Sequence, residues 1–276
     1  MFAELDAIQW NELNHAGGAA TDVPDLLRAL TSTDREIRDA ALHELFGNLW
    51  HQGTVYPATA HAVPFLIEIA NETTLADRAN ALFLLGSIAE STDGPRSAHD
   101  EVARHTDVLR ELLEDGDSTV RAAAAHVLGH LVEHAVAIAP AIRARIEREP
   151  DALARAGMLL ALVPLGDVSD VAVTWLERRF ASLDDERERF AAAVALAHAA
   201  GATTPAAAID VLAMACTDPE ANEKRFTGLY WDVNGSYLPR QALVAAGEAA
   251  YRALPILLDA LLATDDRVTA SFLLED

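Results

Sequence analysis

A short helical pattern recurs along the chain, and this repetition constrains the fold more than any other feature. The pattern is clearest in the stretch Asp117-Ser-Thr-Val-Arg-Ala-Ala-Ala-Ala-His-Val-Leu. Successive copies are separated by 40, 43, 34 and 34 residues, as counted between arginines at equivalent places. These arginines are Arg38, Arg78, Arg121, Arg155 and Arg189. Self-similarity at this period is typical of a solenoid, whose units cannot bury their apolar faces alone.

Each part of the pattern has a physical interpretation. Four residues before the arginine stands Asp or Thr, which predicts a side chain that caps the first turn of a helix. Three residues after the arginine comes a small residue or Met, and seven residues after it comes Leu. These two positions share one helical face and predict a buried seam. The predicted caps are Asp34, Thr74, Asp117, Asp151 and Asp185.

The pattern resembles the second helix of HEAT repeats. Asp117, Val120, Arg121, Ala124 and Leu128 match it best, and the resemblance extends over roughly residues 20–200 and weakly to the end. It implies an all-α, right-handed solenoid of about six to seven helical hairpins. HEAT repeats serve many unrelated roles, so the resemblance does not indicate an activity.

We expect one continuous domain over residues 1–276. Residues 1–22 would form an N-terminal cap with a short helix over residues 3–14. Residues 23–200 would form five clear repeats. Residues 201–276 would form degenerate repeats, with a loop inserted over residues 218–238. The predicted hairpins pair residues 23–32 with 34–50, 57–72 with 75–90, 100–115 with 118–134, 137–148 with 152–165 and 169–182 with 186–200. Residues 91–99 would form a loop between the second and third hairpins.

The charge balance favours a protein partner over nucleic acid. The formal net charge is −22, and Lys224 is the only lysine. Such a surface repels phosphate backbones and favours a basic partner. Cys216 is the only cysteine, which excludes an intramolecular disulfide. The sequence shows no signal-peptide pattern and no apolar run long enough for a membrane span, so we expect a cytoplasmic protein and no membrane contact.

The second helices are predicted to line the concave face of the solenoid. Positions five, nine and thirteen after each arginine would point away from the core, which exposes six of the ten histidines and also Val194. The predicted partner-binding residues on this surface are His43, Trp50, His51, Phe83, Glu90, His126, His130, Glu133, His134 and His198. The histidines would make it pH-sensitive. The alternative is an exposed polar surface without a function.

A metal site is a second hypothesis for the same histidines. His130-Leu-Val-Glu-His134 matches the H-x-x-E-H arrangement of some zinc peptidases, in which histidines on one helical face share a metal. The neighbouring repeats offer no clear third ligand, so we expect no metal and no cofactor. The alternative function is a HEAT-type lyase-like or metal-dependent enzyme that uses these His and Glu residues. Relatives of the phycobilin lyases share this repeat type, but none of their active residues match here.

The stretch Asn48-Leu-Trp-His-Gln-Gly-Thr-Val-Tyr-Pro-Ala-Thr joins the first two repeats. Gly53 is expected to end one helix, and Pro57 is expected to begin the next. Together with the following Ala62-Val-Pro-Phe-Leu, it is similar to a segment of bacterial HEAT-repeat proteins of undefined function. Some of those proteins lie near toxin genes and are suspected immunity proteins, so the resemblance implies an immunity or inhibitor role.

The inserted loop carries four aromatic residues beside Lys224 and Arg225: Phe226, Tyr230, Trp231 and Tyr237. Tyr and Trp are typical interface anchors, so the loop is a candidate interaction surface. Alternatively, it folds back and covers the terminal helices. Taken together, these features predict a non-enzymatic scaffold that binds a basic protein on an acidic concave face.

Overall fold

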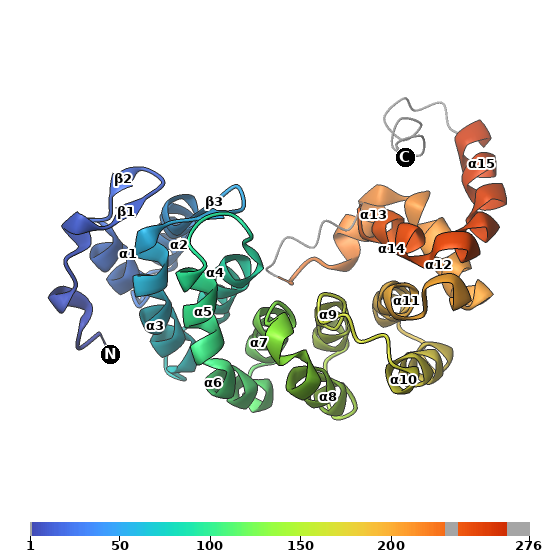
Figure 1. The fold of residues 1–276 in the computed structure, drawn as a ribbon, viewed down its shortest axis with the longest axis horizontal. Helices are drawn as coiled ribbons and strands as arrows, with labels where there is room; N and C mark the ends of the chain where they lie inside the picture. The colour runs from blue at the N-terminus through green and yellow to red at the C-terminus, as the bar shows by residue number, and fades with distance from the viewer. Residues whose placement is uncertain (1, 230–236, 264–276) are drawn as a thin grey trace. The chain divides into compact units, whose positions relative to one another are not determined.

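A computed structural model describes residues 2–229 and 237–263 of the chain (Figure 1). The chain divides into two compact units, Met1–Glu133 and His134–Asp276, and each is described by itself. The fold is all-α and built from helical hairpins, as the repeat pattern predicts. The right-handed sense of the whole solenoid and the single continuous domain stay predictions.

The first unit contains three helical repeats behind an N-terminal cap. The cap holds two short 3-10 turns and a β-hairpin with strands of two residues each. A second β-hairpin with strands of the same length joins the first two repeats. Its elements are η1 (Leu5–Ala7), η2 (Trp10–Glu12), β1 (Asn14–His15), β2 (Gly18–Ala19), α1 (Val23–Ala29), α2 (Arg35–Leu49), β3 (Trp50–His51), β4 (Thr54–Val55), α3 (Pro57–Asn71), α4 (Ala79–Glu90), α5 (Ser97–Arg104), α6 (Thr106–Glu111), η3 (Leu112–Glu114) and α7 (Ser118–Gly129).

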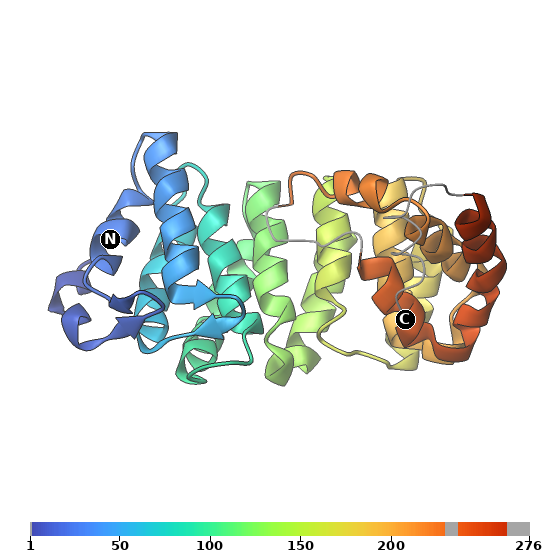
Figure 2. The same ribbon diagram turned by 90° about the horizontal axis from the view of Figure 1, so that it is seen from above.

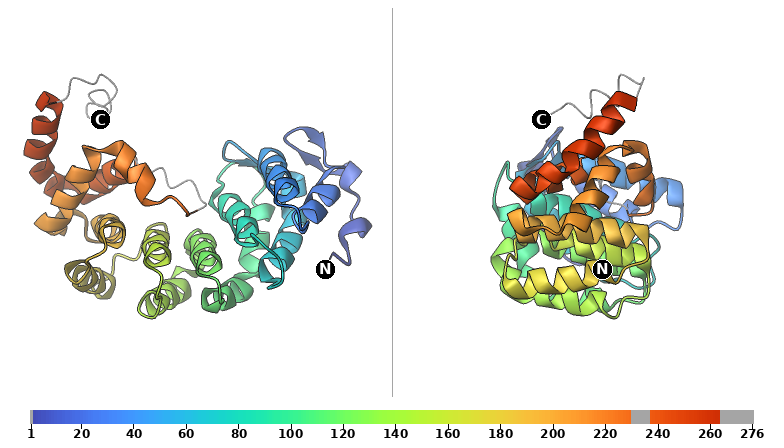
Figure 3. Two further views of the ribbon diagram at one scale, coloured as in Figure 1. Left: turned by 180° about the vertical axis from the view of Figure 1, so that it is seen from behind. Right: turned by 90° about the vertical axis from the view of Figure 1, so that its right-hand side faces the viewer.

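The second unit continues with hairpins that Figure 3 shows nearly end-on. Its elements are α8 (Ala135–Ile146), α9 (Ala152–Ala161), α10 (Asp170–Ala181), α11 (Glu186–Ala200), η5 (Gly201–Thr203), α12 (Ala206–Cys216), α13 (Pro219–Arg225), α14 (Leu238–Ala246), η6 (Gly247–Ala253) and α15 (Leu254–Ala263), and η4 (Val132–His134) precedes them. Helices α9 and α11 pack directly against each other and lie side by side in Figure 2.

The expected helical hairpins are largely confirmed, with differences at their ends. The cap has 3-10 turns instead of a helix over residues 3–14. Helix α7 ends at Gly129, five residues before the predicted end, and the stretch predicted as a loop from residue 91 to 99 already contains the start of α5. The inserted loop contains a helix, α13, whose first turn is capped by Asp218.

Four of the five predicted helix caps are confirmed. The carboxylates of Asp34, Asp117, Asp151 and Asp185 each accept a hydrogen bond from a backbone N–H in the first turn of the following helix. The prediction for Thr74 is wrong, because α4 begins only at Ala79. The chain passes through a left-handed conformation at Asp77, with φ of 52°, and this delays the helix.

The predicted Ala/Leu seams form the core of both units. Ala41, Ala81, Ala124, Met158 and Ala192 are all buried, and so are Leu45, Leu85, Leu128 and Leu196. Leu162 is only half-buried, because α9 ends one residue before it. Small residues at the first seam position let neighbouring second helices approach closely, and the leucines fill the space between them.

The repeated arginines bridge successive repeats. The Arg38 guanidinium donates to the carbonyls of Ser32 and Thr33 in its own inter-helix turn and forms an ion pair with Asp77 of the next repeat, at 2.5 Å. Arg78 does the same with the Ala70 carbonyl and with Asp115, at 2.8 and 2.5 Å.

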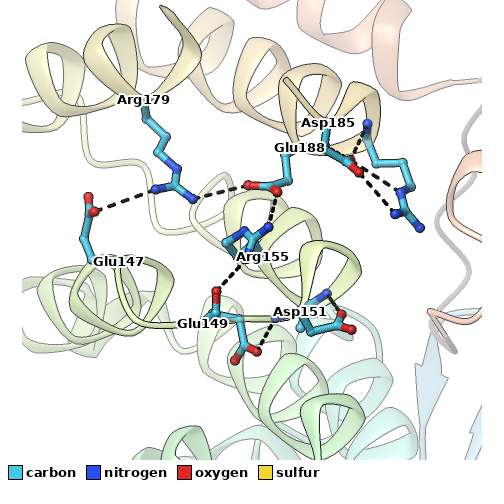
Figure 4. A network of polar contacts seen from close by, with 9 residues as sticks. Glu147, Glu149, Asp151, Arg155, Arg179, Asp185 and Glu188 are labelled. Carbon is cyan, nitrogen blue, oxygen red and sulfur yellow. Dashed lines mark hydrogen bonds and ion pairs between the residues drawn. The ribbon is translucent and has the colours of Figure 1, made fainter. Parts of the chain in front are cut away.

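The same bridge recurs in the second unit, where it widens into a network (Figure 4). Arg155 donates to the Glu149 carbonyl of its own turn, at 2.6 Å, and pairs with Glu188 of the next repeat, also at 2.6 Å. The hydrogen bond that Arg155 donates to Glu188 is the main cause that raises the pKa of Arg155. Glu188 is only 2% exposed and also pairs with Arg179. The buried carboxylate of Glu188 therefore binds two guanidinium groups, one from α9 and one from α10.

Two short β-hairpins were not predicted. In the first, β1 pairs with β2 and places His15 opposite Gly18. In the second, β3 pairs with β4, and the turn between them holds Gln52 and Gly53 with φ of 50° and 88°. Positive φ at both central residues fits the right-handed twist of a tight hairpin. The prediction that Pro57 begins the next helix is confirmed.

Substitution of a bridging arginine should destabilise the protein more than the loss of an exposed ion pair. We expect Arg78→Met to lower the free energy of unfolding by about 3 kcal/mol at neutral pH, because it leaves a buried carboxylate and a carbonyl without their donor. The matched control is Arg96→Met, which breaks the exposed pair with Asp100 and should cost less than about 1 kcal/mol. Urea unfolding measures both, and equal losses would contradict a structural role for the bridge.

The loss of unfolding free energy in Arg78→Met should depend on pH. Burial raises the pKa of Asp115, but the hydrogen bond and charge of Arg78 more than offset this and hold the pKa below its ordinary value. A depressed carboxyl pKa gives stability that is present at neutral pH and lost as the pH falls through the folded-state pKa. The difference between wild type and Arg78→Met should therefore narrow in urea titrations below about pH 4.

Candidate functional site

A recess in the first unit brings together several residues that the sequence singles out. It has a volume of about 340 Å³ and lies between the end of α4, the loop that leads into α5, and the end of α7. Glu90, His99 and His130 are among its lining residues. We call it the histidine recess.

His99 is fixed by hydrogen bonds at both ring nitrogens. Its Nδ1 lies 2.8 Å from the carbonyl oxygen of Ala89, which can only accept, so Nδ1 carries a proton. Its Nε2 lies 2.9 Å from Oε1 of Glu133. The side chain is buried, and the two contacts tie α5 to the end of α4 and to the segment after α7. His99 is not among the site residues predicted from the sequence, because it falls in a stretch that was expected to be a loop.

The rings of His126 and His130 contact each other beside the recess. They lie on consecutive turns of α7 and its C-terminal end, with ring centroids 4.9 Å apart and planes nearly perpendicular. Burial, and then the neighbouring His130, lower the pKa of His126 well below its ordinary value. Burial also lowers the pKa of His130, with Glu90 opposing this effect and His99 adding to it. Both rings are therefore neutral at pH 7 and can each donate and accept one hydrogen bond.

The joining segment with the Trp50–Val55 hairpin supports the recess from one side. The backbone N–H of Val55 donates to the carbonyl of Asp93 at 3.0 Å, and the Thr54 hydroxyl donates to the Asp93 carboxylate at 3.1 Å. Gly94 lies so close to the Val55 carbonyl that no side chain would fit. The joining segment thus positions the loop that lines the recess.

The predicted partner-binding residues divide by exposure. His43, His51, Glu90, Glu133, His134 and Tyr237 lie at the surface, whereas Trp50, His126, His130 and His198 are half-buried. The recess brings Glu90, His130 and, through His99, Glu133 together. His198 lies elsewhere, beside the ion pair of Arg143 and Asp167, and burial lowers its pKa. Tyr230 and Trp231 lie outside the described residues.

Three of the predicted exposures are wrong. Phe83 is 3% exposed, and Val194 is fully buried. Helix α4 packs against α3, α5 and α7, and α11 packs against α9, α10, α12 and α14, so these second helices are covered on more sides than a simple stack implies. Phe226 is also buried, with its ring packed on Phe190 at a centroid distance of 5.7 Å. This aromatic covers the core, in line with the alternative interpretation of the inserted loop.

The helical H-x-x-E-H arrangement is not formed. Because α7 ends at Gly129, His130 and His134 do not share a helical face, and His134 instead stands at the start of α8. Among the residues that the structure describes, no group of three or more His, Cys, Asp and Glu could hold a metal ion. Within the same residues, no single helix is long and apolar enough to cross a membrane. The segments Ser118–Gly129 and Val132–Ile146 reach that length and apolar composition only when they are taken together, and they are bent by 91°.

The comparison with protein families agrees with this architecture. The model of the HEAT repeats matches residues 63–163 and, in an overlapping match, residues 106–197. Residues 63–197 are HEAT repeats. HEAT-repeat proteins typically bind protein partners, which suggests an interaction scaffold. No curated protein matches the chain.

Similar solved structures include two engineered proteins and one natural complex. The first engineered protein is 22% identical, with 83% of this chain and 98% of the other covered and a TM-score of 0.45. The second is 21% identical, with 92% and 67% covered and a TM-score of 0.45. The complex of CpcE and CpcF of phycocyanin lyase from Nostoc sp. PCC7120 is 18% identical, with 85% and 93% covered and a TM-score of 0.47.

The close approach of α4 and α7 at the histidine pair can be tested by a double-mutant cycle. A Cβ at Gly86 would lie 2.5 Å from Nε2 of His126, so Gly86→Ala should lower the free energy of unfolding by about 1–3 kcal/mol. His126→Ala removes the obstructing ring, and the double variant should be more stable than the sum of the two single losses predicts. Additive losses in urea unfolding would show that the ring does not limit this contact.

The lowered pKa of His126 predicts a loss of stability in mild acid. A histidine whose folded-state pKa lies below its unfolded value of about 6.5 is protonated first in the unfolded chain. Stability should therefore fall as the pH drops through about 6.5. The variant His126→Gln should show a shallower fall, as measured by urea midpoints between about pH 7.5 and pH 5.5. An unchanged slope would contradict the role of this ring.

Proposed function

We propose that the chain is a non-enzymatic scaffold that binds a basic protein. The HEAT repeats support the scaffold role, and the net charge of −22 supports a basic partner. The distribution of arginine carries the proposal furthest. Arg38, Arg78, Arg121 and Arg145 are each less than 9% exposed and make internal hydrogen bonds. Four of the 21 Lys and Arg side chains are therefore engaged inside the molecule and are not free to pair with carboxylates of a partner, which supports a basic partner over an acidic one.

Acidic side chains lie on first helices, on second helices and in inter-helix turns. The first helices α5 and α10 carry two each and the second helix α2 carries three (Glu36, Asp39 and Glu44), whereas α7 and α9 contain none. Carboxylates on both kinds of helix support a basic partner. The exposed residues His43 and Glu90 on second helices and His51 in β3 remain candidate contacts of a partner.

An immunity or inhibitor protein that blocks a toxin is the more specific form of this proposal. It is supported by the resemblance of the segment over residues 48–66, which forms the β3–β4 hairpin and the start of α3. A scaffold that blocks another protein needs no catalytic group of its own, only a rigid complementary surface.

Two fluorescent peptides of equal length test the proposal. They share the same apolar residues but carry either Lys and Arg or Asp and Glu at the polar positions. We expect fluorescence anisotropy to show binding of the basic peptide only. The Kd should rise by about tenfold or more between about 50 mM and about 500 mM NaCl, because salt screens exposed charges. Equal binding of both peptides, or no binding of either, would refute a scaffold selective for positive charge.

A further inference from the structure

A groove of the first unit lies outside the predicted second-helix surface. It has a volume of about 800 Å³ and runs between the N-terminal turns and helices α3 and α5. Pro57, Ala60 and Pro64 line it at spacings of three and four residues, so they form one stripe along α3, and Phe65 lines it next to Pro64. Ile8 contributes a further apolar side chain from the N-terminal turns. We call this the α3–α5 groove.

Carboxylates border this apolar stripe. Glu4, Glu68, Asp100 and Glu101 line the groove, with Arg104 as the one lining guanidinium. Glu68 accepts a hydrogen bond from the backbone N–H of Phe2, at 2.7 Å. Glu101 pairs with Arg104, and Asp100 pairs with Arg96, which does not line the groove, across 3.3 Å. The lining itself therefore carries an excess of negative charge around an apolar floor.

The floor also offers a backbone acceptor. Pro64 lies inside α3 and has no N–H, so the carbonyl of Ala60 receives no hydrogen bond from the residue four positions later. Both residues line the groove. A carbonyl freed in this way is satisfied by water or by a donor from a ligand. Lys and Arg side chains carry only donors, so they fit both the carbonyl and the carboxylates.

We infer that the α3–α5 groove is the docking site for a segment of the partner protein in which Lys or Arg residues flank an apolar residue. This inference rests on the proposed function and names the part of the surface that serves it. The apolar residue lies on Pro64 and Phe65, and the basic groups pair with Glu4, Glu68 and Asp100. Sites for drug-sized ligands have about 300–1,000 Å³, so the groove holds several side chains of such a segment.

Charge distinguishes this occupant from a second copy of the chain. The chain has a single lysine, and Lys224 already pairs with Glu220 at 2.6 Å. Several of its arginines are buried in ion pairs between repeats. The chain itself is therefore a poor source of a basic, apolar segment, and like charges on two copies repel each other.

A triple variant with a charge-matched control tests the inference. In Glu4→Gln/Glu68→Gln/Asp100→Asn, the Kd of the basic peptide should rise by about tenfold or more. The control Asp107→Asn/Glu111→Gln/Glu177→Gln removes the same charge from exposed positions outside the groove, and its Kd should change by less than about threefold. Circular dichroism and thermal unfolding confirm that both variants fold.

The results separate this inference from the proposed function. If wild type binds the basic peptide and both triple variants weaken binding equally, the groove inference fails and the scaffold proposal stands. If wild type does not bind the peptide, the scaffold proposal itself fails. Sedimentation velocity gives the remaining outcome, because self-association that the groove variant abolishes would identify a second copy as the occupant and overturn the inference.

Pro64→Ala tests the freed carbonyl separately. Alanine restores the missing helical hydrogen bond, so the variant should keep or raise the melting temperature. It should nevertheless raise the Kd of the basic peptide by about threefold, because the carbonyl of Ala60 is then occupied. A higher melting temperature with an unchanged Kd would show that Pro64 has a structural role only and that the carbonyl does not contact the ligand.

Discussion

The arginine that bridges successive repeats is the interaction on which the rest of the structure depends. Apolar seams of Ala and Leu bring repeats together, but such surfaces tolerate sliding because the hydrophobic effect has no direction. A guanidinium that holds the carbonyls of its own turn and a carboxylate of the next repeat fixes one register. Arg38 with Asp77, Arg78 with Asp115 and Arg155 with Glu188 repeat this geometry. A repeat that docks out of register leaves these charges unpaired, which is costly because buried charges are poorly hydrated.

The sequence reveals the arginines but not what they bind. Their spacing marks the repeats, and the caps and seams around them follow from local geometry, so the hairpins could be predicted well. The carboxylate partners lie 33 to 39 residues further along and change between Asp and Glu at positions outside the pattern. A contact of this kind depends on how hairpins stack, which one repeat does not specify. The delayed start of α4 was also not predicted, because Asp77 with its positive φ pairs with Arg38 of the preceding repeat.

The candidate surfaces were harder to predict. A helical wheel identifies a buried side and an exposed side only where a helix has neighbours on one side. The predicted exposure of Phe83 and Val194 is wrong for this reason, because α4 and α11 have neighbours on several sides. His99 entered the histidine recess from a stretch without a helical signal. The α3–α5 groove was also not visible, because its walls come from the N-terminal turns and from helices α3 and α5, whose residues form no common motif.

The series of bridges also has an end, with a consequence for local opening. Arg189, at the fifth reference position, lies over the ring of Phe180 at 5.3 Å. Helices α12 and α14 pack on α11 beyond this point, and their buried residues are Ala, Ile, Leu, Pro and Cys, none of them charged. Backbone amides in this C-terminal part should therefore exchange their hydrogens with solvent through smaller, independent opening events. Amides between Arg38 and Glu188 should exchange in larger cooperative groups, because opening one repeat there also breaks the ion pair of its neighbour.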